Sequence, residues 1–188
     1  EPVWGLPFLG GPAATLTVRL IEADGARRLP IKAPYTHEPA VPEEATLVVN
    51  VVGFGAFGQP LDDDHAYNAR GLAAFADASY GQKIDVGVMM SALTLGAHSL
   101  IIPHRRFLPL LNAIPQVEQE GRIAQQIARL TLVHANVERV VLGSFGAGAQ
   151  VAYEVRRRVC AIVLAAGQST RMGRQKLLLP WGESETVI

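Results

Sequence analysis

The chain has 188 residues, enough for one large domain or for one domain and part of another. Its composition, 49% hydrophobic and 18% charged, supplies a buried core and excludes a disordered chain. The 17 basic and 17 acidic side chains cancel, so no net charge draws the chain toward nucleic acid or an acidic lipid surface.

The first half of the chain predicts two strands, a proline-rich loop and a helix. Residues 14–21 (ATLTVRLI) and 47–52 (LVVNVV) are apolar and rich in β-branched residues, which is typical of strands. Four prolines between residues 28 and 42 exclude a helix or a central strand, so this segment should be extended at the surface. The acidic run Asp62–Asp64 favours a helix start, and we predict a helix from about His65 to Ser79.

The longest uncharged stretch is not expected to span a membrane, and the cysteine count indicates a cytoplasmic protein. Residues 86–103 approach the length of a membrane span, but their glycine, serine, threonine, histidine and proline residues are unsuited to lipid. We therefore predict a buried loop and strand there. Cys160 is the single cysteine, so it cannot form a disulfide within the chain or a thiolate metal site.

The second half predicts three more strands and two helices. Residues 107–111, 137–142 and 159–164 are apolar runs with strand character. Apolar residues recur on the helical period through 117–130, and 149–158 is predicted as a short helix. Strands that alternate with helices predict a mostly parallel α/β sheet with helices on both faces.

A domain boundary is predicted near residues 146–150, where small residues follow a completed strand. We expect residues 1–147 to form a first α/β domain, truncated at its N-terminus. Residues 159–188 should begin a second domain, truncated at its C-terminus, because so few residues cannot bury a core of their own.

The most specific pattern is Leu164–Lys176 (LAAGQSTRMGRQK). The predicted strand leads into Ala165, Ala166 and Gly167, small residues that let backbone N–H groups approach a phosphate.

Three polar side chains of this loop suit the chemistry of nucleotide transfer. Ser169 offers a hydroxyl donor, Arg171 a forked cation, and Lys176 a point charge on a flexible stem. These groups can neutralise the charge that develops as pyrophosphate leaves. The alternative is a basic loop that follows a core strand.

The run is similar to the L-A-A-G-x-S-x-R-M-G-x-x-K signature of MobA-like transferases, and the following LLLPWG resembles the molybdopterin cytidylyltransferase branch. The resemblance implies that Gly167, Ser169, Arg171, Gly173 and Lys176 bind the nucleotide, with Arg171 and Lys176 catalytic on its phosphates. It also implies CTP or another NTP, Mg²⁺, and molybdopterin as substrate. The family's metal-binding aspartates lie well downstream, so we expect the 188-residue chain alone to be inactive in transfer.

A second resemblance covers residues 15–145. The segments EADGA, PIKAP, HEP, GQPLD and VVLGS are similar to the selenium-dependent hydroxylase accessory proteins of the YqeC type. That family implies a P-loop-like fold, a three-layer sheet, and a place beside molybdenum hydroxylases. The chain has no G-x-x-x-x-G-K-[ST] loop, and residues 112–115 (NAIP) replace a guanine-reading motif, so guanine specificity is not expected.

Three side chains near the first predicted strand are candidate ligands. Glu22 and Asp24 follow the strand two residues apart, where a P-loop fold keeps a carboxylate for Mg²⁺. Asp24-Gly25 is equally typical of an ordinary turn. Lys32 lies between two prolines on a stiff segment that can reach a phosphate, and the alternative is a solvated lysine.

Two other patterns receive structural interpretations. Residues 53–58 (GFGAFG) match the G-x-G-x-x-G dinucleotide pattern, but Pro60 prevents the helix that a pyrophosphate site needs, so we predict a turn. Asp62–Asp64 with His65 have the residue types of a metal site, but an acidic helix start accounts for them more simply.

The function expected from both resemblances is molybdenum cofactor maturation, with transfer of CMP from CTP to molybdopterin and a molybdenum hydroxylase as candidate partner. Nucleic acid and membrane partners are not expected. Two alternatives remain: a nucleotide-dependent chaperone or insertase for such a hydroxylase, and a non-catalytic interaction module.

Overall fold

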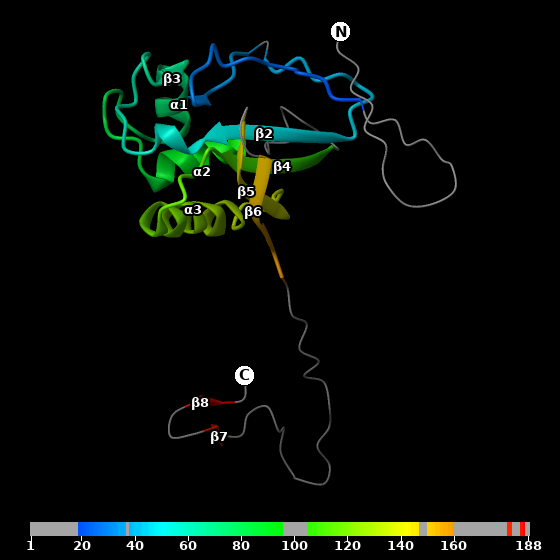
Figure 1. Cartoon of the computed structure of the whole chain (residues 1–188), viewed down its shortest axis with the longest axis vertical. Helices are drawn as coiled ribbons and strands as arrows, with labels where there is room; N and C mark the ends of the chain where they lie inside the picture. The colour runs from blue at the N-terminus through cyan, green and yellow to red at the C-terminus, as the bar shows by residue number, and fades with distance from the viewer. Residues whose placement is uncertain are drawn as a thin grey trace. The chain divides into compact units, whose positions relative to one another are not determined.

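The computed structural model describes residues 19–36, 38–95, 105–146, 150–159, 180–181 and 185–186. The chain divides into two compact units, Glu1–Arg158 and Val159–Ile188. In the second unit the described residues form a short antiparallel pair, β7 (Pro180–Trp181) with β8 (Glu185–Thr186). The helices and larger sheet of Figure 1 belong to the first unit.

A four-stranded sheet organises the first unit. Its order is β2 (Leu47–Gly53), β4 (Arg106–Asn112), β5 (Arg139–Phe145) and β6 (Gln150–Arg157). The first three strands are parallel, and β6 is antiparallel to β5. The strands predicted at 47–52, 107–111 and 137–142 are therefore present, in the mixed α/β arrangement with parallel strands.

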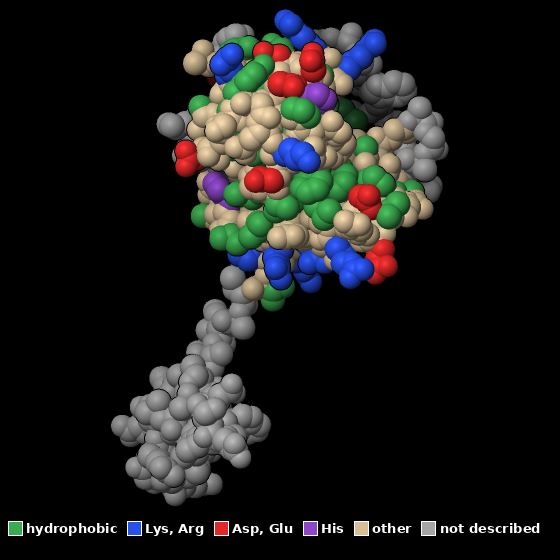
Figure 2. All heavy atoms as spheres, turned by 90° about the vertical axis from the view of Figure 1, so that its left-hand side faces the viewer, with side chains coloured by type: hydrophobic (Ala, Val, Ile, Leu, Met, Phe, Trp, Pro, Cys, Tyr) green, Lys and Arg blue, Asp and Glu red, His purple; other side chains and the backbone are tan. Residues whose placement is uncertain are grey.

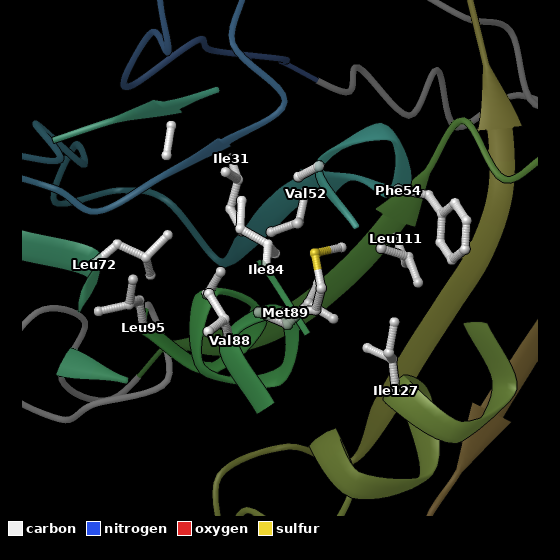
Figure 3. Close-up of a cluster of buried hydrophobic side chains, with 14 of the residues drawn as sticks. Ile31, Val52, Phe54, Leu72, Ile84, Val88, Met89, Leu95, Leu111 and Ile127 are labelled. Carbon is white, nitrogen blue, oxygen red and sulfur yellow. The ribbon is translucent and has the colours of Figure 1, made fainter. Parts of the chain in front are cut away.

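Two helices cover one face of this sheet. α2 (Val86–Thr94) packs against β2 and β4, and α3 (Glu118–Thr131) packs against β5 and α2. Figure 3 shows the core: Met89 of α2 lies near Leu111 of β4, with Ile127 of α3 below Leu111 and Val88 of α2 on the other side of Met89. All four side chains are buried.

On the opposite face, apolar side chains remain exposed. Val51 of β2 is 52% exposed and Val155 of β6 is 55% exposed. Among the described residues the sheet thus has helices on one face, and the three-layer arrangement expected from the sequence is not seen there.

A second, two-stranded parallel sheet lies beside α1 (Ala69–Phe75). It joins β1 (Ile31–Lys32) to β3 (Ala66–Tyr67). Ile31 is 1% exposed, so part of the proline-rich segment predicted at the surface enters the core instead. No helix in the described part of the chain is long and apolar enough to cross a membrane.

The prediction of loop and strand for residues 86–103 is wrong where the structure describes them. Residues 86–94 form α2, and Asp85 caps it because its Oδ1 accepts a hydrogen bond of 3.0 Å from Val88 N. The helix is apolar on nearly every side, so its sequence carried no polar stripe to show the helical period. Residues 96–104 lie outside the described part.

The short helix predicted at 149–158 is a strand, β6. Val151, Tyr153 and Val155 alternate along it, and β-branched and aromatic residues at that spacing favour a strand. Pairing with β5 settles the conformation, with a register irregularity beside Leu142 and Gly143.

The helix predicted from His65 to Ser79 is shorter, from Ala69 to Phe75. Asn68 is its cap, with Oδ1 accepting a 3.2 Å hydrogen bond from Gly71 N, while Asp62–Asp64 form a preceding turn.

The strands predicted at 14–21 and 159–164 are not borne out where they are described. Of 14–21, residues 19–21 are irregular, and 14–18 lie outside the described part. Val159 is likewise irregular, and 160–164 lie outside it.

Gly53 generates a stability prediction. An added Cβ would lie 2.9 Å from Pro30 Cβ, whereas one on Gly55 would meet nothing within 4 Å. Gly53→Ala should therefore lower the free energy of unfolding by about 1–3 kcal/mol through overpacking. Gly55→Ala should change it by less than about 0.5 kcal/mol. Urea denaturation of both variants measures the difference, and equal stabilities would contradict the packing described here.

Candidate functional site

Lys32 is the last residue of β1. Its neighbour Ile31 points into the core, so the Lys32 side chain leaves the strand on the opposite side. Pro30 and Pro34 flank it and restrict the backbone. The buried Ile31 side chain and the two prolines thereby restrict where the Lys32 ammonium can lie.

The Lys32 ammonium meets three oxygen acceptors. Its Nζ donates to the Asp24 carboxylate, to Gly25 O at 3.0 Å and to Glu38 Oε2 at 3.1 Å. The Tyr67 ring centroid lies 4.9 Å from Nζ, within the range of a cation–π contact. We call these five residues the Lys32 cluster.

The Lys32 cluster is largely withdrawn from water. The Lys32 side chain is 16% exposed, and the Asp24 and Glu38 side chains are each 18% exposed. At this depth a charge needs its partners, because water no longer solvates it fully. An ammonium has three donors, and here each one has an acceptor.

A second cation and a second aromatic ring contact the Tyr67 ring of the Lys32 cluster. The Arg27 guanidinium lies 5.1 Å from the Tyr67 ring centroid, and Tyr35 meets that ring edge to face at 5.6 Å. Tyr35 N also donates to Glu38 Oε2 at 3.2 Å. These contacts tie the loop segment to β3.

The structure brings together two of the three predicted ligands near the first strand. Lys32 and Asp24 form an ion pair, while Glu22 is exposed. Oxygen atoms of Asp24, Gly25 and Glu38 converge on the ammonium, which occupies the place a cation would take. In the described residues no group of three or more His, Cys, Asp or Glu is arranged to hold a metal ion.

Two side chains of the Lys32 cluster, those of Glu38 and Tyr67, were not predicted as ligands from the sequence. Glu38 lies within a proline-rich segment, six residues after Lys32, where no periodicity places it. Tyr67 reaches Lys32 because β1 and β3 pair in register, Lys32 opposite Tyr67. Strands of two residues leave no sequence pattern from which that pairing could be read.

The acidic run after β2 forms neither a metal site nor a helix cap. His65 Nδ1 lies 2.6 Å from Asp62 Oδ1, which also accepts a hydrogen bond from Asp64 N at 3.1 Å. The hydrogen bond with His65 lowers the pKa of the Asp62 carboxyl. These contacts brace the turn that precedes β3.

The glycine run behaves as predicted. Gly53 ends β2, Phe54–Ala56 form the short 3₁₀ helix η1, and Gly58 has φ +81° in a turn. Gly58 N donates to Ile84 O at 2.8 Å, which fixes the turn against the loop before α2.

The predicted nucleotide-binding loop lies outside the described residues. This holds for each of its candidate residues: Ala165, Ala166, Gly167, Ser169, Arg171, Gly173 and Lys176.

Comparison with known proteins confirms both resemblances. Residues 10–70 match the family model described as YqeC protein. Residues 161–188 match the model described as MobA-like NTP transferase domain.

One curated relative extends the first match. The chain is 32% identical over 132 residues to "Uncharacterized protein YqeC" of Escherichia coli (strain K12), covering 67% of this chain and 49% of the relative. The chain therefore spans about half the length of the curated relative that it matches. No solved structure matches the chain.

The Lys32 cluster generates a stability prediction. Lys32→Met removes the cation shared by two largely buried carboxylates, so unfolding should require about 1–3 kcal/mol less free energy. Lys83→Met, at an exposed lysine, is the matched control and should stay within about 0.5 kcal/mol of the parent.

Adding Asp24→Asn and Glu38→Gln to Lys32→Met should recover part of the loss, because the two negative charges that lost their shared cation are then removed. Thermal and urea denaturation of the four proteins test this. A Lys32→Met variant as stable as its control would show that the cluster is not a structural support.

Proposed function

We propose that this protein acts in maturation of the molybdenum cofactor. In this proposal, a polypeptide that joins the chain to a complete transferase domain transfers CMP from CTP to molybdopterin. The observation that carries the proposal is the match of residues 161–188 to a MobA-like NTP transferase domain, on one chain with a YqeC match. The transferase match supports use of a nucleotide, and the YqeC match supports an accessory role.

The proposed chemistry rests on charge neutralisation. Backbone N–H groups at Ala165, Ala166 and Gly167 would receive a phosphate in a loop that small residues leave open. Arg171 would bind phosphate oxygens through its fork, and Lys176 would add a second positive charge. Both interactions strengthen as the leaving pyrophosphate gains charge. Interactions that are stronger in the transition state than in the bound substrate accelerate the transfer.

Ser169 and Gly173 complete the proposed loop. The Ser169 hydroxyl would donate one more hydrogen bond to the nucleotide, and Gly173 would keep the backbone close to it. When bound, Mg²⁺ supplies further neutralisation of the triphosphate.

For the first unit we propose Asp24 and Glu22 as Mg²⁺ ligands and Lys32 as a phosphate contact. Carboxylate and carbonyl oxygens are the donors that Mg²⁺ prefers, and the oxygens around Lys32 Nζ are of this kind. Either role requires Lys32 to leave the acceptors it now holds. That requirement separates this proposal from a purely structural ion pair.

A nucleotide-dependent chaperone or insertase for a molybdenum hydroxylase is the second candidate. It is favoured by the YqeC match, which lies in the larger of the two compact units. In this candidate the C-terminal signature is not used for transfer. Hydroxylase maturation that depends on the first unit and survives loss of Arg171 would favour it.

The first candidate predicts a loss of catalysis without a loss of folding. In a polypeptide with the complete transferase domain, Arg171→Ala and Lys176→Ala should each reduce cytidylyl transfer about ten- to a hundredfold, the value of a charge-assisted hydrogen bond. Arg171→Lys should also be impaired, because a point charge cannot reproduce the fork. Pyrophosphate release and the melting temperature are measured together.

Arg174→Ala is the matched control, because residue 174 is a variable position of the signature. It should retain transfer. Unchanged transfer in Arg171→Ala, Arg171→Lys and Lys176→Ala would refute the assignment, as would a fall in melting temperature that accounts for the whole loss.

A further inference from the structure

The edge strand β6 presents polar side chains toward the helical face of the sheet. In the β5–β6 register, Glu154 lies opposite Leu142 and Arg156 opposite Val140. Leu142 and Val140 are buried on the face that α3 covers, so Glu154 and Arg156 point to the same side. Their side chains are about one-third exposed.

α3 presents a complementary polar face. Arg122, Gln125, Gln126 and Arg129 are spaced three, four and seven residues apart, which places them along one side of the helix. Gln125 Nε2 donates to Glu154 Oε2 at 3.2 Å, so this side faces β6. A groove, the α3–β6 groove, runs between these polar rows.

One half of the α3–β6 groove is an apolar cavity of about 520 Å³. Its lining includes Ile114, Val117, Leu142 and the ring of Tyr153. The Tyr153 hydroxyl is held at the rim, where it accepts a 3.2 Å hydrogen bond from Gln116 Nε2. The volume and the apolar lining with a few polar groups are typical of a small-molecule site.

The other half is a basic cavity of about 230 Å³. Three arginines and two glutamines line it: Arg122, Arg129, Arg156, Gln125 and Gln126. Gln125 also lines the apolar cavity, so the two halves are contiguous. Figure 2 shows basic side chains gathered on the side of the unit where Figure 1 places α3.

The charges of the basic cavity are only partly compensated. Arg122 pairs with Glu118 and Arg156 with Glu154, each at 2.8 Å. In the part of the chain that the structure describes, Arg129 has no ion-pair partner. A guanidinium has five N–H donors, so a single contact to a carboxylate oxygen leaves most of them for another acceptor.

Ion pairs at the protein surface do not account for this arrangement. Exposed pairs contribute little to stability, and three guanidiniums around one hollow repel one another. A bound anion removes that repulsion and satisfies the remaining donors.

We propose that the α3–β6 groove binds a small molecule in which a flat ring carries a phosphate. The ring enters the apolar cavity beside Tyr153, and the phosphate lies against Arg122, Arg129 and Arg156. Nucleotides and other ring phosphates share this chemistry. The site belongs to the first unit and does not depend on the function proposed for the C-terminal signature.

Binding to the full chain tests the proposal by calorimetry. The probes are AMP, CMP and riboflavin 5′-phosphate. Cytidine, which has the ring without the phosphate, and inorganic phosphate, which has no ring, are tested separately. At least one ring phosphate should bind saturably and at least about tenfold more tightly than cytidine or inorganic phosphate, because both cavities are then filled. Comparing AMP and CMP with riboflavin 5′-phosphate shows whether the groove prefers a nucleotide or another ring phosphate.

Variants locate the binding. Arg129→Gln should weaken it by about tenfold or more, the value of one charge-assisted contact, with little change in melting temperature. Arg106→Gln, an equal charge change at an exposed arginine on the other face of the sheet, should have no effect. Tyr153→Leu should weaken ring phosphates and leave inorganic phosphate unchanged.

Three results would overturn the proposal. The first is the absence of saturable binding for all three ring phosphates. The second is an affinity unchanged by both Arg129→Gln and Arg156→Gln. The third is binding that is lost on Arg171→Gln and kept on Arg129→Gln, which would place the ligand at the C-terminal signature instead.

Discussion

The burial of α2 is the constraint on which the first unit depends. Met89 and Leu93 have no exposed surface, and the helix packs against α1, α3, β2 and β4. Asn50 of β2 locks it further, because Asn50 Nδ2 donates to Ala92 O at 2.9 Å and Leu93 O at 3.1 Å. These bonds satisfy carbonyls in the last turn of the helix. A helix so enclosed fixes α1, α3 and the strands β2 and β4 around it.

This packing positions two polar sites, the Lys32 cluster and the α3–β6 groove. Ile31 enters the core and turns Lys32 outward, into the oxygens of Asp24 and Glu38. On the far side, α3 covers β5 and leaves the edge strand β6 with its polar side chains beside a helix. Arg158 braces that edge, donating through Nη2 to Leu132 O at 2.8 Å just after α3 ends. The second site is built on a helix and a strand, and sites on such elements are held more precisely than sites on loops.

The sequence predicted elements whose pattern was local and strong. The strands at 47–52, 107–111 and 137–142 and the helix α3 carry clear apolar runs or a clear helical stripe. α2 was missed because it is apolar nearly all round, and β6 because strand pairing decided an ambiguous segment. Lys32 and Asp24 were predicted as ligands from their setting. Their partners Glu38 and Tyr67 depend on contacts that only the folded chain makes.

The central claim is that this protein acts on a nucleotide through its C-terminal signature. Hydrogen exchange, followed by mass spectrometry, tests it most directly in a polypeptide that joins the chain to a complete transferase domain. With saturating CTP and Mg²⁺, the account predicts slower exchange in peptides spanning residues 164–176, because their N–H groups then bind phosphate. Exchange that is unchanged there, at a CTP concentration that supports transfer by a known cytidylyltransferase, would contradict the account.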